Sequence, residues 1–168
     1  MSTISIYVHW PFCLSLCPYC DFNSHIANNV DHNSWLKAYE KELEHFTWKI
    51  RNKEIKSIFF GGGTPSLMQP FVVQGIIDKI ASIGTISDSC EITLEANPTS
   101  FETDKFKQFK SAGINRVSLG IQTFDEKDLL AMHVLIYKKE NTRQSDTGIL
   151  NNVIEIITLI QTSIPKNG

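Results

Sequence analysis

Several features that would narrow the function are missing from this sequence of 168 residues. There is no dense block of Lys and Arg, and the formal net charge is −2, so the charge does not favour nucleic acid or an anionic membrane as a partner. No apolar run reaches the length of a membrane span. The first twenty residues lack the basic start of a signal peptide and carry His9 and Pro11. We therefore expect a cytoplasmic protein with no integral membrane segment.

Cysteine is scarce but concentrated. Of the 4 cysteines, Cys13, Cys17 and Cys20 follow the spacing C-x3-C-x2-C. In a reducing compartment such a group more often binds metal or serves catalysis than forms disulfides. Thiolates are soft ligands that suit iron–sulfur clusters, zinc and copper(I). Three of them leave one corner of a cubane cluster without a protein ligand, whereas zinc would need a fourth ligand such as His25 or Cys90.

The rest of the composition is that of an ordinary globular domain. Hydrophobic residues make up 42% and charged residues 20%, so the chain can bury a sizeable core. Pro11 and Pro18 disfavour helix around the cysteines, so we expect these on an irregular loop. Cys90 is expected to pack as a small buried residue.

Strand and helix patterns alternate along the first three quarters of the chain. Short β-branched and aromatic runs predict strands, and apolar residues at spacings of three and four predict helices. The expected strands are residues 4–10, 55–60, 91–96 and 116–121, and the expected helices are 34–50, 70–83, 103–112 and 125–133. Short connections between alternating elements indicate parallel strands with helical crossovers, and hence an α/β sheet or barrel.

The alternation of strand and helix patterns does not continue in the C-terminal stretch. Residues 138–148 are polar and unpatterned, and apolar positions then predict a helix over 149–162. We therefore divide the chain into a domain at 1–133 and a divergent tail at 134–168.

Residues suited to chemistry follow each predicted strand. The cysteine loop follows the first strand, Gly61 to Thr64 the second, Glu95 and Asn97 end the third, and Gln122 ends the fourth. In parallel α/β folds ligands bind at the carboxyl ends of the strands, so these groups are expected to converge. Adjacent glycines let the backbone approach a ligand, and a carboxylate such as Glu95 can hold an α-amino group.

Five segments resemble one known family. They are Tyr7-Val8-His9 before Pro11-Phe12-Cys13, the cysteine spacing with Tyr19 before Cys20, Gly61-Gly62-Gly63-Thr64-Pro65-Ser66, Glu95-Ala96-Asn97-Pro98, and Gly113 through Gln122. Together they resemble the radical SAM family of oxygen-independent coproporphyrinogen III oxidases, and most closely its haem-chaperone branch. The resemblance covers about residues 4–133 and implies a partial (β/α) barrel of about four strand–helix units.

The resemblance implies cofactors and contacts. A [4Fe–4S] cluster would bind Cys13, Cys17 and Cys20, and its open iron would chelate S-adenosylmethionine. The family's cofactor contacts correspond to Tyr7, Tyr19, Gly62, Gly63, Thr64, Glu95 and Gln122. Haem and haem-accepting proteins are the further partners that the haem-chaperone branch implies, although no histidine stands out as a haem ligand.

Two departures from the family pattern affect the expected function. The oxidases carry another cysteine two residues after the third ligand, where this chain has Phe22, so the haem-chaperone branch is favoured and oxidative decarboxylation disfavoured. The family's arginine after His133 is replaced by Val134, and the later barrel strands are not found, so we expect a truncated chain. A degenerate, non-catalytic metal-binding fragment is the alternative hypothesis.

Overall fold

The described strands form an open parallel sheet. The structure is a computed structural model, and it describes residues 2–17, 19–97 and 103–121. The strands of this main sheet are β1 (Thr3–Trp10), β4 (Glu54–Gly62), β5 (Thr85–Ala96) and β6 (Arg116–Leu119), in the order β1-β4-β5-β6. All neighbouring pairs are parallel. The sequence-based prediction of four parallel strands is therefore confirmed.

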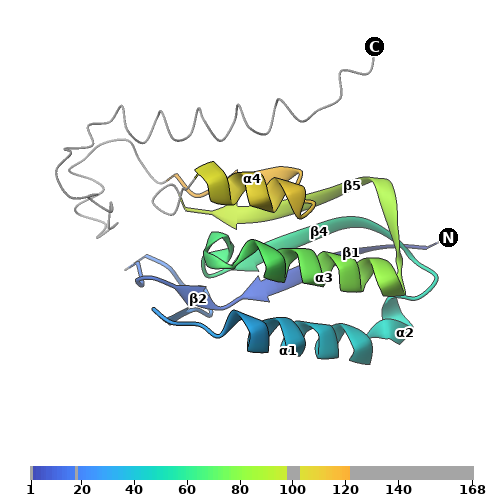
Figure 1. Cartoon of the computed structure of the whole chain (residues 1–168), viewed down its shortest axis with the longest axis horizontal. Coiled ribbons are helices and arrows are strands. Elements are labelled where there is room, and N and C mark those ends of the chain that lie inside the picture. The colour runs from blue at the N-terminus through green and yellow to red at the C-terminus, as the bar shows by residue number, and fades with distance from the viewer. Residues whose placement is uncertain (1, 18, 98–102, 122–168) are drawn as a thin grey trace, which may run out of the picture.

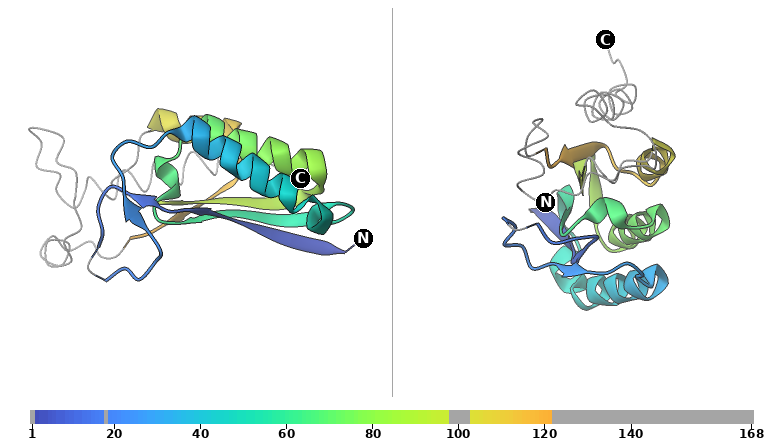
Figure 2. Two further views of the ribbon diagram at one scale, coloured as in Figure 1. Left: turned by 90° about the horizontal axis from the view of Figure 1, so that it is seen from below. Right: turned by 90° about the vertical axis from the view of Figure 1, so that its left-hand side faces the viewer.

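Helices cover one face of this sheet. They are α1 (His32–His45), the short α2 (Thr47–Ile50), α3 (Pro70–Ile83) and α4 (Thr103–Ser111). Figure 2 shows α1, α3 and α4 on the same side of the strands. A 3-10 turn, η1 (Pro65–Leu67), precedes α3, and a second small sheet pairs β2 (Phe12–Cys13) with β3 (His25–Ile26).

Local chemistry explains where the helices begin and end. Asp31 caps α1, because its side chain accepts from the backbone N–H groups of Asn33 and Ser34, each at 3.1 Å. The helix therefore begins two residues before the predicted Ser34. Pro70 occupies the first turn of α3, and Gly113, with φ of 109°, follows α4 as its predicted C-terminal stop.

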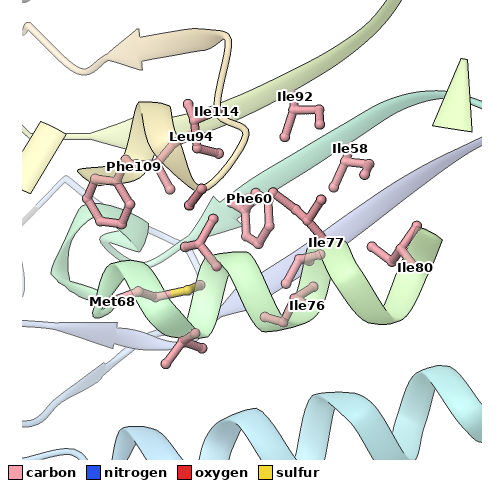
Figure 3. Packing of buried hydrophobic residues seen from close by; sticks show 14 of the residues in the cluster. Ile58, Phe60, Met68, Ile76, Ile77, Ile80, Ile92, Leu94, Phe109 and Ile114 are labelled. Atoms are coloured by element: carbon pink, nitrogen blue, oxygen red, sulfur yellow. The ribbon is translucent and has the colours of Figure 1, made fainter. Parts of the chain in front are cut away.

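The core lies between the sheet and the helices. Alternation along β1 places Val8 and Trp10 on the buried face and leaves Tyr7 exposed on the other. Figure 3 shows the centre of this core between β4, β5, α3 and α4. Its labelled side chains are Ile58, Phe60, Met68, Ile76, Ile77, Ile80, Ile92, Leu94, Phe109 and Ile114. Burial of these aliphatic and aromatic groups is the main stabilising term of the domain.

The third strand begins earlier than the sequence pattern predicts. Ile86 pairs with Ile55 and Glu91 with Ser57, so residues 87–90 of β5 lie opposite Lys56 alone. Ser87, Asp88 and Ser89 in this irregular segment are polar. The first part of the strand therefore lacks the apolar pattern from which a strand would be predicted. The predicted helix at 125–133, the domain boundary at 133/134 and the predicted helix at 149–162 lie outside the described residues.

Candidate functional site

The carboxyl end of the sheet is joined directly to the cysteine loop. Beyond β4, the N–H of Gly63 donates to the carbonyl of Trp10 at 2.6 Å, and the N–H of Thr64 donates to the carbonyl of Phe12 at 2.9 Å. These two bonds continue the β1–β4 pairing past the end of the strands. The glycine turn is thus held against the first residues of the loop, as Figure 1 shows at the end of the sheet near β2.

The loop is also closed at its base. The N–H of His25 donates to Pro11 at 2.7 Å, and the N–H of Ala27 donates to Cys13 at 3.2 Å. Between these points the N–H of Cys20 donates to the carbonyl of Cys17 at 3.0 Å, which forms a turn. The small β2–β3 sheet, which the sequence patterns did not predict, therefore fixes both ends of the cysteine loop.

The three loop cysteines are free thiols in different surroundings. Cys13 and Cys17 are half-buried, while Cys20 is exposed. Among the described residues, no three His, Cys, Asp or Glu side chains lie together as a ready-made metal site. The predicted ligands thus share one loop whose ends are fixed, without their sulfurs being gathered at a common point.

The donor set and its surroundings fit a thiolate-bound cluster. Three reduced thiols supply soft ligands, and the Thr64 hydroxyl donates to Cys13 Sγ at 3.4 Å. A Cβ on Gly63 would lie 2.7 Å from the carbonyl oxygen of Phe12 and 3.0 Å from Cys13 Sγ. The glycine therefore keeps open the space beside this sulfur.

The surroundings of the other proposed zinc ligands do not complete a zinc site. Cys90 is buried in the core cluster, in agreement with its predicted role as a packing residue. Burial raises the pKa of its thiol. His25 is exposed on β3, and no metal group in the described part of the chain includes either residue.

Tyr19 lies among the loop cysteines. Partial burial, followed by interaction with the Cys17 side chain and the negative charges of Cys17 and Cys20 as thiolates, raises the pKa of Tyr19 to about 12. Tyr19 is thus neutral at physiological pH and adjoins two of the proposed cluster ligands.

A carboxylate and a tyrosine flank the glycine turn on the face of the sheet opposite the helices. Glu95 Oε2 accepts from the N–H of Gly62 at 3.2 Å. Tyr7 stacks on Phe59 with ring centroids 6.0 Å apart, and a Cβ on Gly61 would lie 3.0 Å from the Tyr7 hydroxyl. Burial, followed by the negative charge of Glu95, raises the pKa of Tyr7. The structure therefore places Tyr7, Gly62 and Glu95 in one neighbourhood.

His9 is a residue whose place in this site the sequence did not reveal. Its Nε2 is 3.1 Å from the carbonyl oxygen of Asn23, at the end of the cysteine loop. Gly62 has φ of 112°, and a Cβ there would lie 2.5 Å from His9 Nδ1. The Tyr39 hydroxyl donates to the His9 carbonyl at 2.6 Å. His9 thus links the loop, the glycine turn and α1; its position two residues after Tyr7, on the same strand face, was the available signal.

The site can therefore offer several kinds of contact. The loop supplies soft sulfur ligands, the turn lacks side chains at its glycines and so lets a ligand approach the backbone closely, and Glu95 supplies negative charge for a cationic group. Gln122 and Val134, two positions on which the sequence interpretation depends, lie outside the described residues. None of the described helices is long and apolar enough to span a membrane.

Comparison with known proteins identifies relatives of the whole arrangement. The chain is 39% identical over 127 residues to "Heme chaperone HemW" of Escherichia coli, a match that covers 75% of this chain and 34% of the relative. It is 40% identical over 125 residues to "Radical S-adenosyl methionine domain-containing protein 1, mitochondrial" of Danio rerio, covering 74% of this chain and 28% of the relative. The chain thus spans about a third of the length of these relatives.

A solved structure supports the fold. The coproporphyrinogen III oxidase HemN from Escherichia coli, described as a radical SAM enzyme, matches with a TM-score of 0.80 over 94% of this chain and 35% of that chain. At 23% sequence identity this likeness shows the fold, and it confirms the predicted α/β partial barrel. The sequence profile of the Radical SAM superfamily matches residues 7–162, well over half of the sequence. The chain belongs to the radical SAM superfamily.

Proposed function

We propose that this chain is a haem-chaperone-like radical SAM protein that binds a [4Fe–4S] cluster and S-adenosylmethionine and takes part in haem binding and transfer. The observation that carries the proposal is the physical junction of the cysteine loop with the glycine turn and Glu95. Relatives named as haem chaperones, at about 40% identity, support the choice of branch.

In this proposal each group of residues has a distinct role. Cys13, Cys17 and Cys20 hold the cluster, which supplies one-electron reduction chemistry to the sulfonium of S-adenosylmethionine when both are bound. The cofactor lies against the residues Tyr7, Tyr19, Gly62, Gly63, Thr64, Glu95 and Gln122. Glu95 already accepts from Gly62 through Oε2, which leaves Oε1 available for a cationic amino group.

The oxidase activity is not the function that we favour. Similarity to the HemN structure extends to the fold, whereas Phe22 stands where the oxidases have a further cysteine. Phe22 is exposed and cannot act as a thiolate ligand. We expect no decarboxylated product when the reconstituted protein is incubated with coproporphyrinogen III, S-adenosylmethionine and a reductant.

Anaerobic reconstitution with iron and sulfide tests the cluster. The native chain should gain sulfur-to-iron charge-transfer absorbance, and the triple variant Cys13→Ala, Cys17→Ala, Cys20→Ala should not. Equal absorbance in both proteins would show that the loop does not bind the cluster.

Titration with haem tests the second half of the proposal. A saturable change in the haem absorption spectrum, followed by transfer to an apo haem protein, is the expected result. A spectrum identical to that of free haem would contradict haem binding. Cluster binding without haem binding would leave a radical SAM protein of another class, and binding of neither would favour a non-catalytic fragment.

The extent of the cofactor-binding domain is a separate proposal. We propose that it occupies residues 1–133 and that residues 134–168 form a divergent segment. Limited proteolysis followed by mass spectrometry should yield a protected fragment ending near residue 133. A protected fragment that includes residues 149–162 would contradict this division.

A further inference from the structure

We infer that Thr64 is a hydrogen-bond donor to the cluster ligand Cys13 and that this bond raises the reduction potential of the cluster. The inference rests on the proposed function, because it requires the cluster to bind the cysteine loop. It assigns the Thr64 side chain to the cluster ligand, in addition to any contact that residue 64 makes with S-adenosylmethionine.

The contact itself is present in the structure. Thr64 Oγ1 lies 3.4 Å from Cys13 Sγ, a separation typical of a hydrogen bond to sulfur, and both side chains are partly buried. A threonine hydroxyl can donate only one hydrogen, and sulfur is here its acceptor. The two residues are 51 positions apart in sequence, so the fold rather than local chain geometry brings them together.

The backbone fixes the donor in place. The N–H of Thr64 donates to Phe12, the residue immediately before Cys13, at 2.9 Å, and the N–H of Gly63 donates to Trp10 at 2.6 Å. These bonds hold Thr64 beside Cys13 without help from the rest of the loop. Cys13 in turn belongs to β2, whose pairing with β3 fixes its own backbone.

The Thr64 hydroxyl does not cap the short helix that follows it. Thr64 is the N-cap residue of η1, where a threonine commonly caps the helix, yet its side chain makes no capping hydrogen bond. Asp31, the N-cap residue of α1, does cap its helix through its side chain. The Thr64 hydroxyl is directed to Cys13 instead.

Gly63 allows this approach. A Cβ at position 63 would lie 2.7 Å from the Phe12 carbonyl oxygen and 3.0 Å from Cys13 Sγ, closer than ordinary contact distances. A side chain there would push the turn away from the sulfur. The absence of a side chain at 63 and the hydroxyl at 64 are therefore parts of one arrangement.

The loop cysteines consequently have unequal surroundings. Cys17 and Cys20 lie farther along the loop, and Cys20 is exposed, whereas the half-buried Cys13 accepts from a donor at the end of β4. A donor directed at a ligand sulfur places positive charge density beside it and stabilises the more negative, reduced cluster. Hydrogen bonds to the sulfurs are among the factors that set iron–sulfur potentials. Loss of the Thr64 donor should therefore make the cluster harder to reduce.

The test compares donorless and donor-retaining variants of the full chain. Thr64→Val replaces the hydroxyl by a methyl group and keeps the side-chain shape. Thr64→Ala removes the hydroxyl and the methyl group, and Thr64→Ser keeps the hydroxyl as the matched control. Each protein is reconstituted anaerobically with iron and sulfide, and its iron content and circular dichroism are measured. The midpoint potential of the cluster is then determined by dithionite titration monitored by electron paramagnetic resonance.

The expected result is a midpoint potential that is more negative in Thr64→Val and Thr64→Ala than in the native chain, by more than the scatter of repeated titrations, and nearly unchanged in Thr64→Ser. Loss of the cluster from both donorless variants, with retention in Thr64→Ser, would also support the hydrogen bond. Equal potentials in all four proteins, or cluster loss in Thr64→Ser as well, would overturn the inference while leaving the proposed function standing. Failure of the native chain to take up a cluster would overturn both.

Discussion

At the scale of single residues, Gly62 has two reasons to lack a side chain. Its φ of 112° belongs to a region that L-residues avoid, and a Cβ would lie 2.5 Å from His9 Nδ1 and 2.8 Å from the Trp10 carbonyl oxygen. Gly113 shares the unusual φ, at 109°, but a Cβ there would be 3.4 Å from its nearest neighbour, Ile77. A substitution at Gly113 therefore introduces backbone strain alone, whereas one at Gly62 introduces backbone strain and a steric clash.

This comparison yields a stability prediction. Gly113→Ala should lower the free energy of unfolding by about 1–2 kcal/mol, the ordinary cost of a left-handed residue. Gly62→Ala should cost more, because His9 or the backbone of Trp10 must also move. Urea denaturation of both variants and the native chain measures these differences. Equal losses in the two variants would show that the contact with His9 does not constrain the site.

Glu95 gives a binding prediction at the same scale. Glu95→Gln keeps an acceptor for the Gly62 N–H but removes the charge proposed to hold the amino group of S-adenosylmethionine. Loss of a charge-assisted hydrogen bond is worth about 1.5–3 kcal/mol, so the affinity should fall by roughly ten- to a hundredfold. Isothermal titration calorimetry of the reconstituted protein measures this change.

Glu91, a carboxylate earlier in the same strand and away from the candidate site, provides the control. Glu91 lies on β5 before the end of the strand and pairs with Thr93 and Arg116. Glu91→Gln should leave the affinity for S-adenosylmethionine within about a factor of two, since exposed ion pairs contribute little. Similar losses in both variants would mean that Glu95 has no special role.

At the scale of elements, the start of α1 is tied to the start of α3 through His32. Its ring stacks on Trp10 with centroids 5.5 Å apart, and its Nδ1 is 3.5 Å from the N–H of Gln69, the N-cap residue of α3. Burial, followed by repulsion from Lys105, lowers the pKa of His32, although Asp31 acts in the opposite direction. The folded protein therefore favours the neutral ring.

The sign of the resulting pH dependence follows from this shift. Because the pKa of His32 is lower in the folded than in the unfolded state, its contribution is complete above the unfolded value of about 6.5 and is lost as the pH falls below it. Between about pH 7 and pH 5, the free energy of unfolding should fall less steeply in His32→Phe than in the native chain. Identical slopes in urea titrations would contradict this assignment.

Asn115 fixes the register between β5 and β6. Its Oδ1 accepts from the N–H of Ile92 at 2.8 Å, and its Nδ2 donates to the carbonyl of Cys90 at 2.8 Å. Asn115→Ala leaves both backbone groups unpaired and should cost about 2–3 kcal/mol of unfolding free energy. Ser89→Ala, at an exposed position of the same irregular segment, should change it by less than about 0.5 kcal/mol. Comparable effects of the two substitutions would refute this role.

The sequence predicted the elements better than the contacts between them. Periodicity identified all four strands of the main sheet and the three longer helices of the described residues, because burial on one face produces a regular apolar pattern. It did not predict β2, β3 or the early start of β5, since two-residue strands and a polar irregular segment leave no such pattern. The link from His9 to Asn23 and that from Thr64 to Cys13 depend on tertiary structure.

At the scale of the whole molecule, the described helices all lie on one face of the main sheet (Figure 2). The opposite face carries Tyr7 and Glu95 at its carboxyl end. Parallel sheets are usually covered on both faces. The candidate site therefore lies where this face, which carries none of the described helices, meets the cysteine loop, and it draws residues from β1, β4 and β5.

The central claim is that the three loop cysteines bind a cluster whose fourth iron is open to S-adenosylmethionine. The most direct measurement is the electron paramagnetic resonance spectrum of the reduced, reconstituted protein before and after addition of S-adenosylmethionine. We predict a cluster signal in the native chain that changes when the cofactor is added, and no such signal in the triple cysteine-to-alanine variant. A signal of equal strength in that variant, or a native signal unaffected by saturating S-adenosylmethionine, would contradict the account.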